Sequence, residues 1–553
     1  MLRQQSSTGI RAADPGVRTD CCYGFKIAPI ARNLKPLRHW SRSGRRRISL
    51  RRRAVRDDNL CHVNIEALRN GGAVIPEVKI LSDEEVRLLH TRALDVLHKV
   101  GIKYESRRVL DLLAEHGQKV DYDSGIAWLD PEIVERCLKT TPRVITLAGR
   151  DPKHDILTDG SRLRVTTNGQ ATFTQDYRTG VRRQGLVQDL RDSTKVGHHI
   201  DVVDFIWPMV VPFDVPGPSR VLHEMYHSLS MTTKHIQHEI QLPEHVPFAL
   251  EMLEVTAGSK EELKRRPPFS VVACTVSPLQ HEPKMADLCI ELARAGIPIV
   301  IWPMPLTGAT APVTVPGTCL MSLIEFLSGV VLFQLAAPGC PLIYPLGPEV
   351  LDMRSGMAVC GSPEIPLFNL ILGQMAKFYN VPAIGVGLNS DAKIPGIQAA
   401  YESMHTGMAA ALSGADLLVG IGVLDDNNTM SLTELVIEAE IARMVKRIRE
   451  GAVVTDETLM VHLIEKAGPG QHFLGFKETL HGLKTGAVFF PKYSYRSTYD
   501  KFFEEGNDEL EKARAEVDRL LALPDPDPLP PEVDKELKRI VAAADKACAE
   551  SAA

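Results

Sequence analysis

The sequence predicts an α/β protein built on a closed (β/α)8 TIM barrel, with a mainly helical N-terminal layer and a helical C-terminal extension. From residue 162 onward, an apolar segment followed by an amphipathic segment recurs eight times. Strands that alternate with helices pair in parallel, and eight such units favour closure into a barrel. A doubly wound sheet is the alternative. It is weakened because no GxGxxG turn follows any of these strands.

Residues 1–74 form a basic head that we expect to be disordered. Met1–Asp58 carries 15 Lys and Arg against 4 Asp and Glu, which leaves 49 basic and 65 acidic residues for the rest of the chain. The head is interpreted as an arm that contacts an anionic partner, a targeting segment, or translated sequence ahead of the true start. The acidic remainder argues against a nucleic-acid-binding protein.

Residues 75–155 are expected to form the helical layer. Ser82 and Glu85 make a capping box at the start of its first helix. The predicted elements are the helices Val78–Gly101, Ser106–His116 and Pro131–Leu138 and the short strand Val144–Ala148.

Residues 156–450 are expected to form the barrel. Gly or Pro punctuates several helix-to-strand junctions, as in Gly296-Ile297-Pro298. The predicted strands are Leu163–Asn168, Val203–Met209, His235–Ile240, Ser270–Val276, Pro298–Met304, Pro341–Leu346, Pro382–Leu388 and Leu417–Val423. The predicted helices are Leu186–His199, Ser219–Thr232, Pro243–Ala257, Glu282–Ala295, Val315–Ala336, Pro363–Tyr379, Ile397–Ser413 and Ser431–Glu450.

Residues 451–553 are expected to form the C-terminal extension. An aromatic-rich connector leads to the amphipathic helices Asp508–Ala522 and Pro531–Ala547, which Pro524–Pro531 links. The spacing of the last helix predicts docking on another surface.

The longest apolar run, Cys319–Ala337, contains Glu325 and Gln334, so it is interpreted as a buried helix and not as a membrane span. The ten cysteines include no CxxC pair, which argues against a zinc ribbon or a disulfide framework. We expect a cytoplasmic protein.

In a barrel of this kind the residues at the carboxyl ends of the strands share one mouth. Ile384–Tyr401 supplies its most polar turn, for which an N-capping loop is the plain structural interpretation. Aromatic rings, amides and carboxylates outnumber lysines here, which suits a cationic ligand. The residues expected at the mouth are Asn168, Gln170, Trp207, His235, His238, Thr275, Ser277, Trp302, Met304, Tyr344, Asn389, Ser390, Asp391, Asp425 and Asp426.

One motif points to different chemistry. His223-Glu224-Met225-Tyr226-His227 matches HExxH, in which two histidines four apart on a helix bind zinc and the glutamate acts as a base. The match is short and falls on the second barrel helix, away from the strand ends. A zinc hydrolase that uses His223 and His227 is therefore kept as an alternative.

Several short sequence motifs, which occur in the same order along the chain, resemble those of the trimethylamine methyltransferase family, and the resemblance covers about residues 75–540. They are TTKH (Thr232–His235), TVSPL (Thr275–Leu279), AGIP (Ala295–Pro298), MPLTGATAPVTVPG (Met304–Gly317), DMRSG (Asp352–Gly356), GSPE (Gly361–Glu364), SDAKIPGIQAAYE (Ser390–Glu402) and GPGQHFL (Gly468–Leu474).

The resemblance implies a barrel whose mouth holds a methylated amine beneath a docked corrinoid protein. The corrinoid (cobalamin), carried by that partner, would accept the methyl group at Co(I), and this chain would bind no metal. Members that use trimethylamine carry pyrrolysine, and this sequence contains none. The resemblance therefore implies a quaternary amine such as a betaine, with trimethylamine as the alternative. A barrel that senses betaines without catalysis is a further alternative. A homo-oligomer is expected.

Eight residues are the candidates for the site. His235 is expected to donate a hydrogen bond to a substrate carboxylate or to orient a neighbour, and Trp302 and Tyr344 to face the ammonium. Asp391 is expected to neutralise the ammonium or to orient its turn, with Lys393 as its partner or as a carboxylate anchor. Asn168, Gln170 and Asn389 complete the set.

Overall fold

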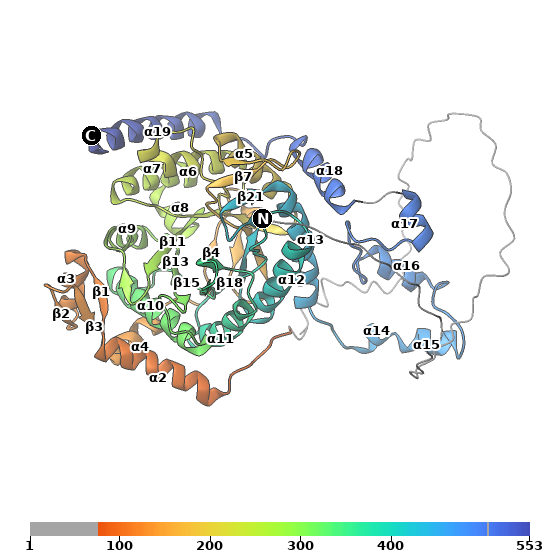
Figure 1. Cartoon of the computed structure of the whole chain (residues 1–553), viewed down its shortest axis with the longest axis horizontal. Helices are drawn as coiled ribbons and strands as arrows, with labels where there is room; N and C mark the ends of the chain where they lie inside the picture. The colour runs from red at the N-terminus through yellow and green to blue at the C-terminus, as the bar shows by residue number, and fades with distance from the viewer. Residues whose placement is uncertain (1–75, 506–507, 553) are drawn as a thin grey trace, which may run out of the picture. The chain divides into compact units, whose positions relative to one another are not determined.

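Eight parallel strands close into a barrel in the computed structural model, which describes residues 76–505 and 508–552. Each strand pairs in parallel with the next, and the last pairs with the first, so the predicted barrel is confirmed (Figure 1). The strands are β6 (Arg164–Thr167), β9 (Val203–Ile206), β10 (His235–His238), β11 (Phe269–Val276), β13 (Ile299–Trp302), β15 (Leu342–Pro345), β18 (Ala383–Val386) and β19 (Leu417–Ile421). The basic head lies outside the described residues.

Eight long helices surround the strands, and each matches a predicted one (Figure 1). They are α5 (Val187–His199), α6 (Arg220–Met231), α7 (Val246–Ala257), α9 (Pro283–Arg294), α10 (Val315–Ala336), α11 (Glu364–Phe378), α12 (Ile397–Leu412) and α13 (Leu432–Arg449). The short helix α8 (Lys260–Arg265) follows α7.

Every second residue of a barrel strand points into the barrel, because successive side chains of a strand point to opposite faces. Phe205, Val272, Val300 and Ile343 belong to one internal cluster that also holds Trp207 and Trp302. The intervening residues, such as Val271, Ile299 and Leu342, pack against the helices. Both faces of strands such as β11, β13 and β15 are therefore apolar.

Helix α10 is the one described helix that is long and apolar enough to cross a membrane, and most of it is buried inside the protein. The predicted buried helix is thus confirmed. Glu325 accepts hydrogen bonds from Ser277 Oγ at 2.8 Å and from the Leu279 amide at 3.0 Å. The polar residue in this helix therefore fixes the loop after β11.

The N-terminal layer contains α2 (Asp83–Lys99), α3 (Arg107–Glu115) and α4 (Pro131–Thr140). The three short strands β1 (Ile102–Tyr104), β2 (Lys119–Asp121) and β3 (Ile126–Trp128) were not predicted. They join the barrel sheet through β12 (Gln280–His281).

A small hairpin packs against the inside of the barrel. β4 (Thr146–Leu147), which the sequence predicts, pairs with β5 (Ile156–Leu157). Ile145, Leu147 and Ile156 belong to the internal barrel cluster. Because the Ala148 carbonyl contacts His235 at the start of β10, the hairpin lies at the amino ends of the strands.

The C-terminal extension ends in two helices that dock on the barrel. α18 (Glu509–Leu521) contacts α13 and α5, and α19 (Pro531–Ala552) contacts α6 and α7. Both were predicted, and the second runs five residues further than expected. Before them lie α14 (Asp456–Leu459), α15 (Val461–Ala467), α16 (Lys477–Lys484) and α17 (Tyr499–Glu505).

Two small sheets formed by loops stand at the carboxyl ends of the strands. One contains β14 (Leu306–Thr307), β16 (Glu349–Asp352) and β17 (Met357–Val359). The other contains β7 (Phe173–Gln175), β8 (Arg182–Gln184), β20 (Val423–Leu424) and β21 (Thr429–Ser431). Neither was predicted, and both bring polar side chains to the mouth.

Candidate active site

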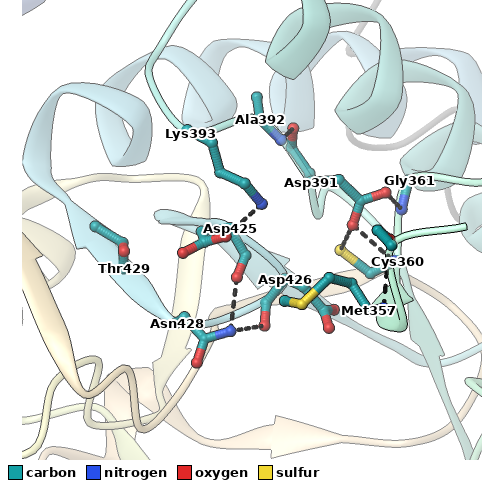
Figure 2. Close-up of polar contacts among 12 residues, drawn as sticks. Met357, Cys360, Gly361, Asp391, Ala392, Lys393, Asp425, Asp426, Asn428 and Thr429 are labelled. Atoms are coloured by element: carbon teal, nitrogen blue, oxygen red, sulfur yellow. Dashed lines mark hydrogen bonds and ion pairs between the residues drawn. The ribbon is translucent and has the colours of Figure 1, made fainter. Parts of the chain in front are cut away.

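Three turns bring carboxylates together at the mouth of the barrel. Asp391 follows β18, Asp426 follows β20, and Glu349 begins β16; we call these three residues the carboxylate cluster. The Sγ atom of Cys360 and one carboxylate oxygen each of Asp391 and Asp426 lie within 4.8 Å of one another. Figure 2 shows Asp391 turned toward Cys360 and Gly361, with Asp426 in the neighbouring turn.

Backbone amides hold the Asp391 carboxylate in place. Its Oδ1 accepts a hydrogen bond from the Cys360 amide at 2.9 Å, and its Oδ2 accepts one from the Gly361 amide at 3.0 Å (Figure 2). Glu402 of α12 fixes the other side of the turn, where it accepts from Ser390 Oγ at 2.7 Å and from the Asp391 amide at 2.8 Å. The polar turn is therefore rigid, and it also orients Asp391.

Asp426 sits on strained backbone. Asp425, Asp426 and Asn427 have φ values of 58°, 49° and 65°, a region that side chains other than Gly rarely adopt. The Oδ1 atom of Asp426 is buried and has no hydrogen-bond partner among the described residues. Strain of this kind persists where the surrounding structure enforces it, and it is frequent at functional sites.

The cluster is electrostatically unfavourable without a ligand. Burial, together with the charges of Asp426 and Asp391, raises the pKa of Glu349 to about 8. Burial and the Asp391 charge also raise the pKa of Asp426. The neighbouring cations Lys393 and Arg182 both form ion pairs with Asp425. A ligand that supplies positive charge would relieve the repulsion within the cluster.

A fourth carboxylate lies at the end of β10. Burial raises the pKa of Glu239. Burial, and then the charges of Glu239 and Glu349, hold the pKa of the Cys274 thiol well above its usual range. Because Glu239 directly follows His238, the last residue of β10, it lies at the same end of the barrel as the cluster.

Two indole rings line the inside of the barrel near this end. The rings of Trp207 and Trp302 meet edge to face with centroids 5.5 Å apart, and they are 6 % and 8 % exposed. A Cβ atom on Gly169 would lie 2.1 Å from the Trp207 ring, so a glycine is required there. The pair offers aromatic surface to a cation beside the carboxylates.

The amides predicted for the mouth mostly bond to other mouth residues. Asn168 Nδ2 donates to Asn427 Oδ1 at 2.5 Å, and Gln170 Nε2 lies 3.2 Å from His238 Nδ1. With its amide nitrogen facing Gly387 and Gly420, Asn389 donates to both carbonyls at 3.0 and 3.2 Å. Asn389 therefore fixes the ends of these two strands. Lys393 forms an ion pair with Asp425, and its side chain is largely exposed.

The structure places two predicted residues elsewhere. His235 begins β10 at the amino end of the barrel, where its Nδ1 contacts the Ala148 carbonyl at 3.0 Å and its Nε2 contacts Ser270 Oγ at 2.9 Å. Tyr344 faces the helix layer, where its hydroxyl lies 3.0 Å from Ser322 Oγ and its ring stacks on Phe326. Placing these two residues at the mouth was wrong.

The HExxH helix has the wrong partners for a zinc site. Glu224 accepts from His238 Nε2 at 2.8 Å, with both side chains buried. His223 Nε2 instead contacts Asp545 of α19 at 2.8 Å. The glutamate and the first histidine therefore point to different neighbours, and the motif serves to join α6 to the barrel and to α19.

Comparison with known proteins identifies the family. The profile described as "Trimethylamine methyltransferase (MTTB)" matches residues 42–548. The chain belongs to the trimethylamine methyltransferase family. A trimethylamine methyltransferase of Desulfitobacterium hafniense (strain DCB-2) is 32 % identical over 466 residues, which are 83 % of this chain and 92 % of that protein. A glycine betaine methyltransferase of D. hafniense (strain Y51) is 30 % identical over 473 residues, which are 85 % of this chain and 98 % of that protein.

A solved structure with a related arrangement is the monomethylamine methyltransferase of Methanosarcina barkeri. It aligns over 83 % of this chain and 92 % of its own length, with a TM-score of 0.48 and 11 % identity.

Sequence reasoning missed three residues of this methyltransferase's mouth, namely Glu239, Glu349 and Cys360. One signal was available, since Glu239 lies near the carboxyl end of the predicted strand His235–Ile240 and Glu349 closely follows the predicted strand Pro341–Leu346. Acids at the carboxyl ends of barrel strands suggest a site. Cys360 gave no such signal, because it reaches the mouth only through the fold of the β16–β17 hairpin.

Proposed function

We propose that this methyltransferase moves a methyl group from a quaternary amine, such as a betaine, to the Co(I) of a corrinoid carried by a separate protein. Family membership supports the reaction class. The observation that carries the choice of substrate is the carboxylate cluster, in which three acids crowd together and the neighbouring Lys393 and Arg182 pair with Asp425. The sequence contains no pyrrolysine, which also favours a quaternary amine.

The residues present fit the binding of a cation. Asp426 would attract the ammonium through charge, as Glu349 would once it ionises near pH 8, and Trp302 and Trp207 would offer it ring surface. Asp391, already held by two backbone amides, would keep its position. These groups would orient one methyl group toward the open side of the mouth, which brings the reacting atoms into line.

No acid is needed for the leaving group. A quaternary ammonium that loses a methyl group departs as a neutral tertiary amine, so no proton has to move. The corrinoid supplies the nucleophile, and this chain supplies position and electrostatics. The carboxylates would also stabilise the bound cation, so the aim of the methyl group, rather than tight binding, would set the rate.

The rim of the mouth suits a docked protein. Met304, Met353, Met357 and Ile397 lie on the segments that follow β13, β15 and β18, with Met357 at the start of β17 and Ile397 at the start of α12, and each is at least 44 % exposed. Apolar side chains in such a position favour a protein partner.

The seven described cysteines are all free, in keeping with a reducing cytoplasm, which remains a prediction.

The test is methyl transfer to cob(I)alamin, followed by the absorbance change on methylation. The substrates are glycine betaine, proline betaine, carnitine and trimethylamine, each at the same concentration. We expect turnover with at least one betaine and none with trimethylamine. Turnover with trimethylamine alone would favour the alternative substrate. Binding of a betaine without any turnover would favour a sensor.

A further inference from the structure

Gln237 is a buried glutamine whose side-chain amide has no hydrogen-bond partner. It is the third residue of β10 and is 0 % exposed, and neither its Nε2 nor its Oε1 is bonded to any other residue that the structure describes. Folded proteins pair nearly all of their buried amide groups, because an unpaired group has lost its hydrogen bonds to water without compensation. Exceptions to this rule are expected at functional sites.

The side chain of Gln237 points into the barrel. Ile236 belongs to the cluster that packs against the helices, so the residues on either side of it, His235 and Gln237, face the opposite way. In agreement, the ring of His235 meets that of Phe205, which belongs to the internal cluster. Ser270, which pairs with Gln237 on β11, bonds to His235 Nε2 at 2.9 Å and not to the amide.

Trp207 brings a second donor without a partner to the adjacent strand. Ile236 pairs with Ile206, so Gln237 and Trp207 form the next pair along β10 and β9. Neighbouring strands lie about 5 Å apart, and side chains of such a pair share one face of the sheet. The indole Nε1 of Trp207 is buried and also has no partner among the described residues. Two adjacent side chains thus offer N–H donors to the barrel interior.

The depth of Gln237 in the barrel indicates which part of the substrate it meets. Glu239, two residues further along the chain, lies at the end of the barrel that holds the carboxylate cluster. Gln237 is therefore about 7 Å deeper than Glu239. In the proposed reaction the methyl group that is transferred points out of the mouth, toward the corrinoid. The substituent on the opposite side of the nitrogen then points inward, past the two indole rings and toward Gln237.

We propose that Gln237, together with the indole N–H of Trp207, binds an oxygen atom on this inward-pointing substituent and so selects quaternary amines that carry one. The inference rests on the proposed function. Both groups are neutral donors, which either a carboxylate or a hydroxyl oxygen satisfies. A purely alkyl amine would leave them unpaired, and buried donors discriminate strongly against a ligand that lacks the acceptor. Because Gln237 is fully buried, a side chain nearer the mouth has to move when the ligand enters, and Trp302 lies there against Trp207.

The test is calorimetric titration of the full chain, without corrinoid, with glycine betaine, proline betaine, carnitine, choline and tetramethylammonium. We expect at least one of the first four ligands to bind about tenfold more tightly than tetramethylammonium. The preference between the betaines and choline identifies the oxygen group as carboxylate or hydroxyl. Gln237→Met keeps the length of the side chain, so it should bind tetramethylammonium as the wild type does and lose most of the discrimination.

Two results would overturn this inference and leave the proposed function standing. They are equal affinities of the wild type for all five ligands, and discrimination that survives in Gln237→Met. If none of the five ligands binds to the wild type, both the proposed function and this inference fail.

Thermal stability gives a second readout. Gln237→Met removes an amide without a partner among the described residues, so Tm should stay the same or rise. The matched control is Gln334→Met on α10, where a glutamine that is 2 % exposed donates to the Cys340 carbonyl at 2.9 Å and accepts from the Gly339 amide at 2.8 Å. This control should lower Tm and keep the wild-type discrimination. A loss of stability in Gln237→Met as large as in Gln334→Met would show that the free protein already satisfies the amide, which would also overturn the inference.

Discussion

The Nε2 atom of His238 lies 2.8 Å from a carboxylate oxygen of Glu224, and neither side chain is more than 2 % exposed. The contact joins β10 to α6. With Nε2–H donating to Glu224, the Nδ1 of His238 is left as an acceptor for Gln170. One buried acid thus sets the tautomer of a histidine that in turn positions a residue of the mouth.

Removal of this acid should destabilise the fold. Glu224→Ala leaves a buried imidazole N–H without a partner, which we expect to lower the free energy of unfolding by about 2 kcal/mol. Glu224→Gln keeps an acceptor and should cost less. Urea unfolding of both variants measures the difference, and equal losses would show that the hydrogen bond contributes nothing.

Purified protein should contain no stoichiometric zinc, because His223 and Glu224 have different partners. Metal analysis after expression in zinc-supplemented medium is the measurement. His223→Ala should leave metal content and methyl transfer unchanged. One zinc per chain, lost in that variant, would restore the hydrolase interpretation.

The two aromatic residues predicted for the mouth should separate in kinetics. Trp302 lies in the barrel interior and Tyr344 faces α10. Trp302→Leu removes ring surface worth about 1–2 kcal/mol to a cation, so KM for the quaternary amine should rise about tenfold. Tyr344→Phe should cost about 1 kcal/mol of stability and leave KM unchanged. A rise in KM for Tyr344→Phe as large as that for Trp302→Leu would contradict this assignment.

Charge in the cluster should determine affinity. Asp426→Asn keeps the shape of the side chain and removes one charge, so we expect KM to rise at least tenfold with a smaller change in kcat. Asp352→Asn is the matched control, since Asp352 lies on the same strand, β16, as Glu349 and bonds to its own turn at Arg354 and Ser355. If both variants behave alike, the effect is general electrostatics and the cluster has no special role.

The barrel was predictable because its strands are buried on both faces and its helices are amphipathic. Each strand and helix can therefore be recognised from its own stretch of sequence. The same burial hides which residues point inward. Leu342 and Tyr344 face the helices while Ile343 faces the interior, and all three are apolar enough for either side. Tyr344 was misplaced for this reason.

The mouth was less predictable because its parts come from loops. Asp391 was found because it lies in the polar turn after a predicted strand, whereas Cys360 contacts it only after the β16–β17 hairpin folds back. His235 and His238 stand three residues apart in one strand, so they lie at opposite ends of it. The sequence pattern does not show which end of a short strand a given residue occupies in space.

The pH dependence of binding should show the state of the cluster. Burial and the neighbouring acids raise the pKa of Glu349 to about 8, so its carboxyl holds a proton at neutral pH. A quaternary ammonium does not titrate. As pH rises through about 8, Glu349 ionises, the negative charge of the cluster grows, and the dissociation constant for the amine should fall.

Calorimetric titration with a betaine between pH 6 and 9, without corrinoid, measures this directly. Glu349→Gln should make the dissociation constant nearly independent of pH and should leave it near the wild-type value at low pH. Stability should move in the opposite direction. Because the folded protein keeps a proton that the unfolded chain releases near pH 4.5, this group contributes stability that is lost as pH rises from there to about 8. Glu349→Gln should therefore gain thermal stability relative to wild type at pH 8 but not at pH 4, and a dissociation constant that rises with pH in the wild type would contradict this account.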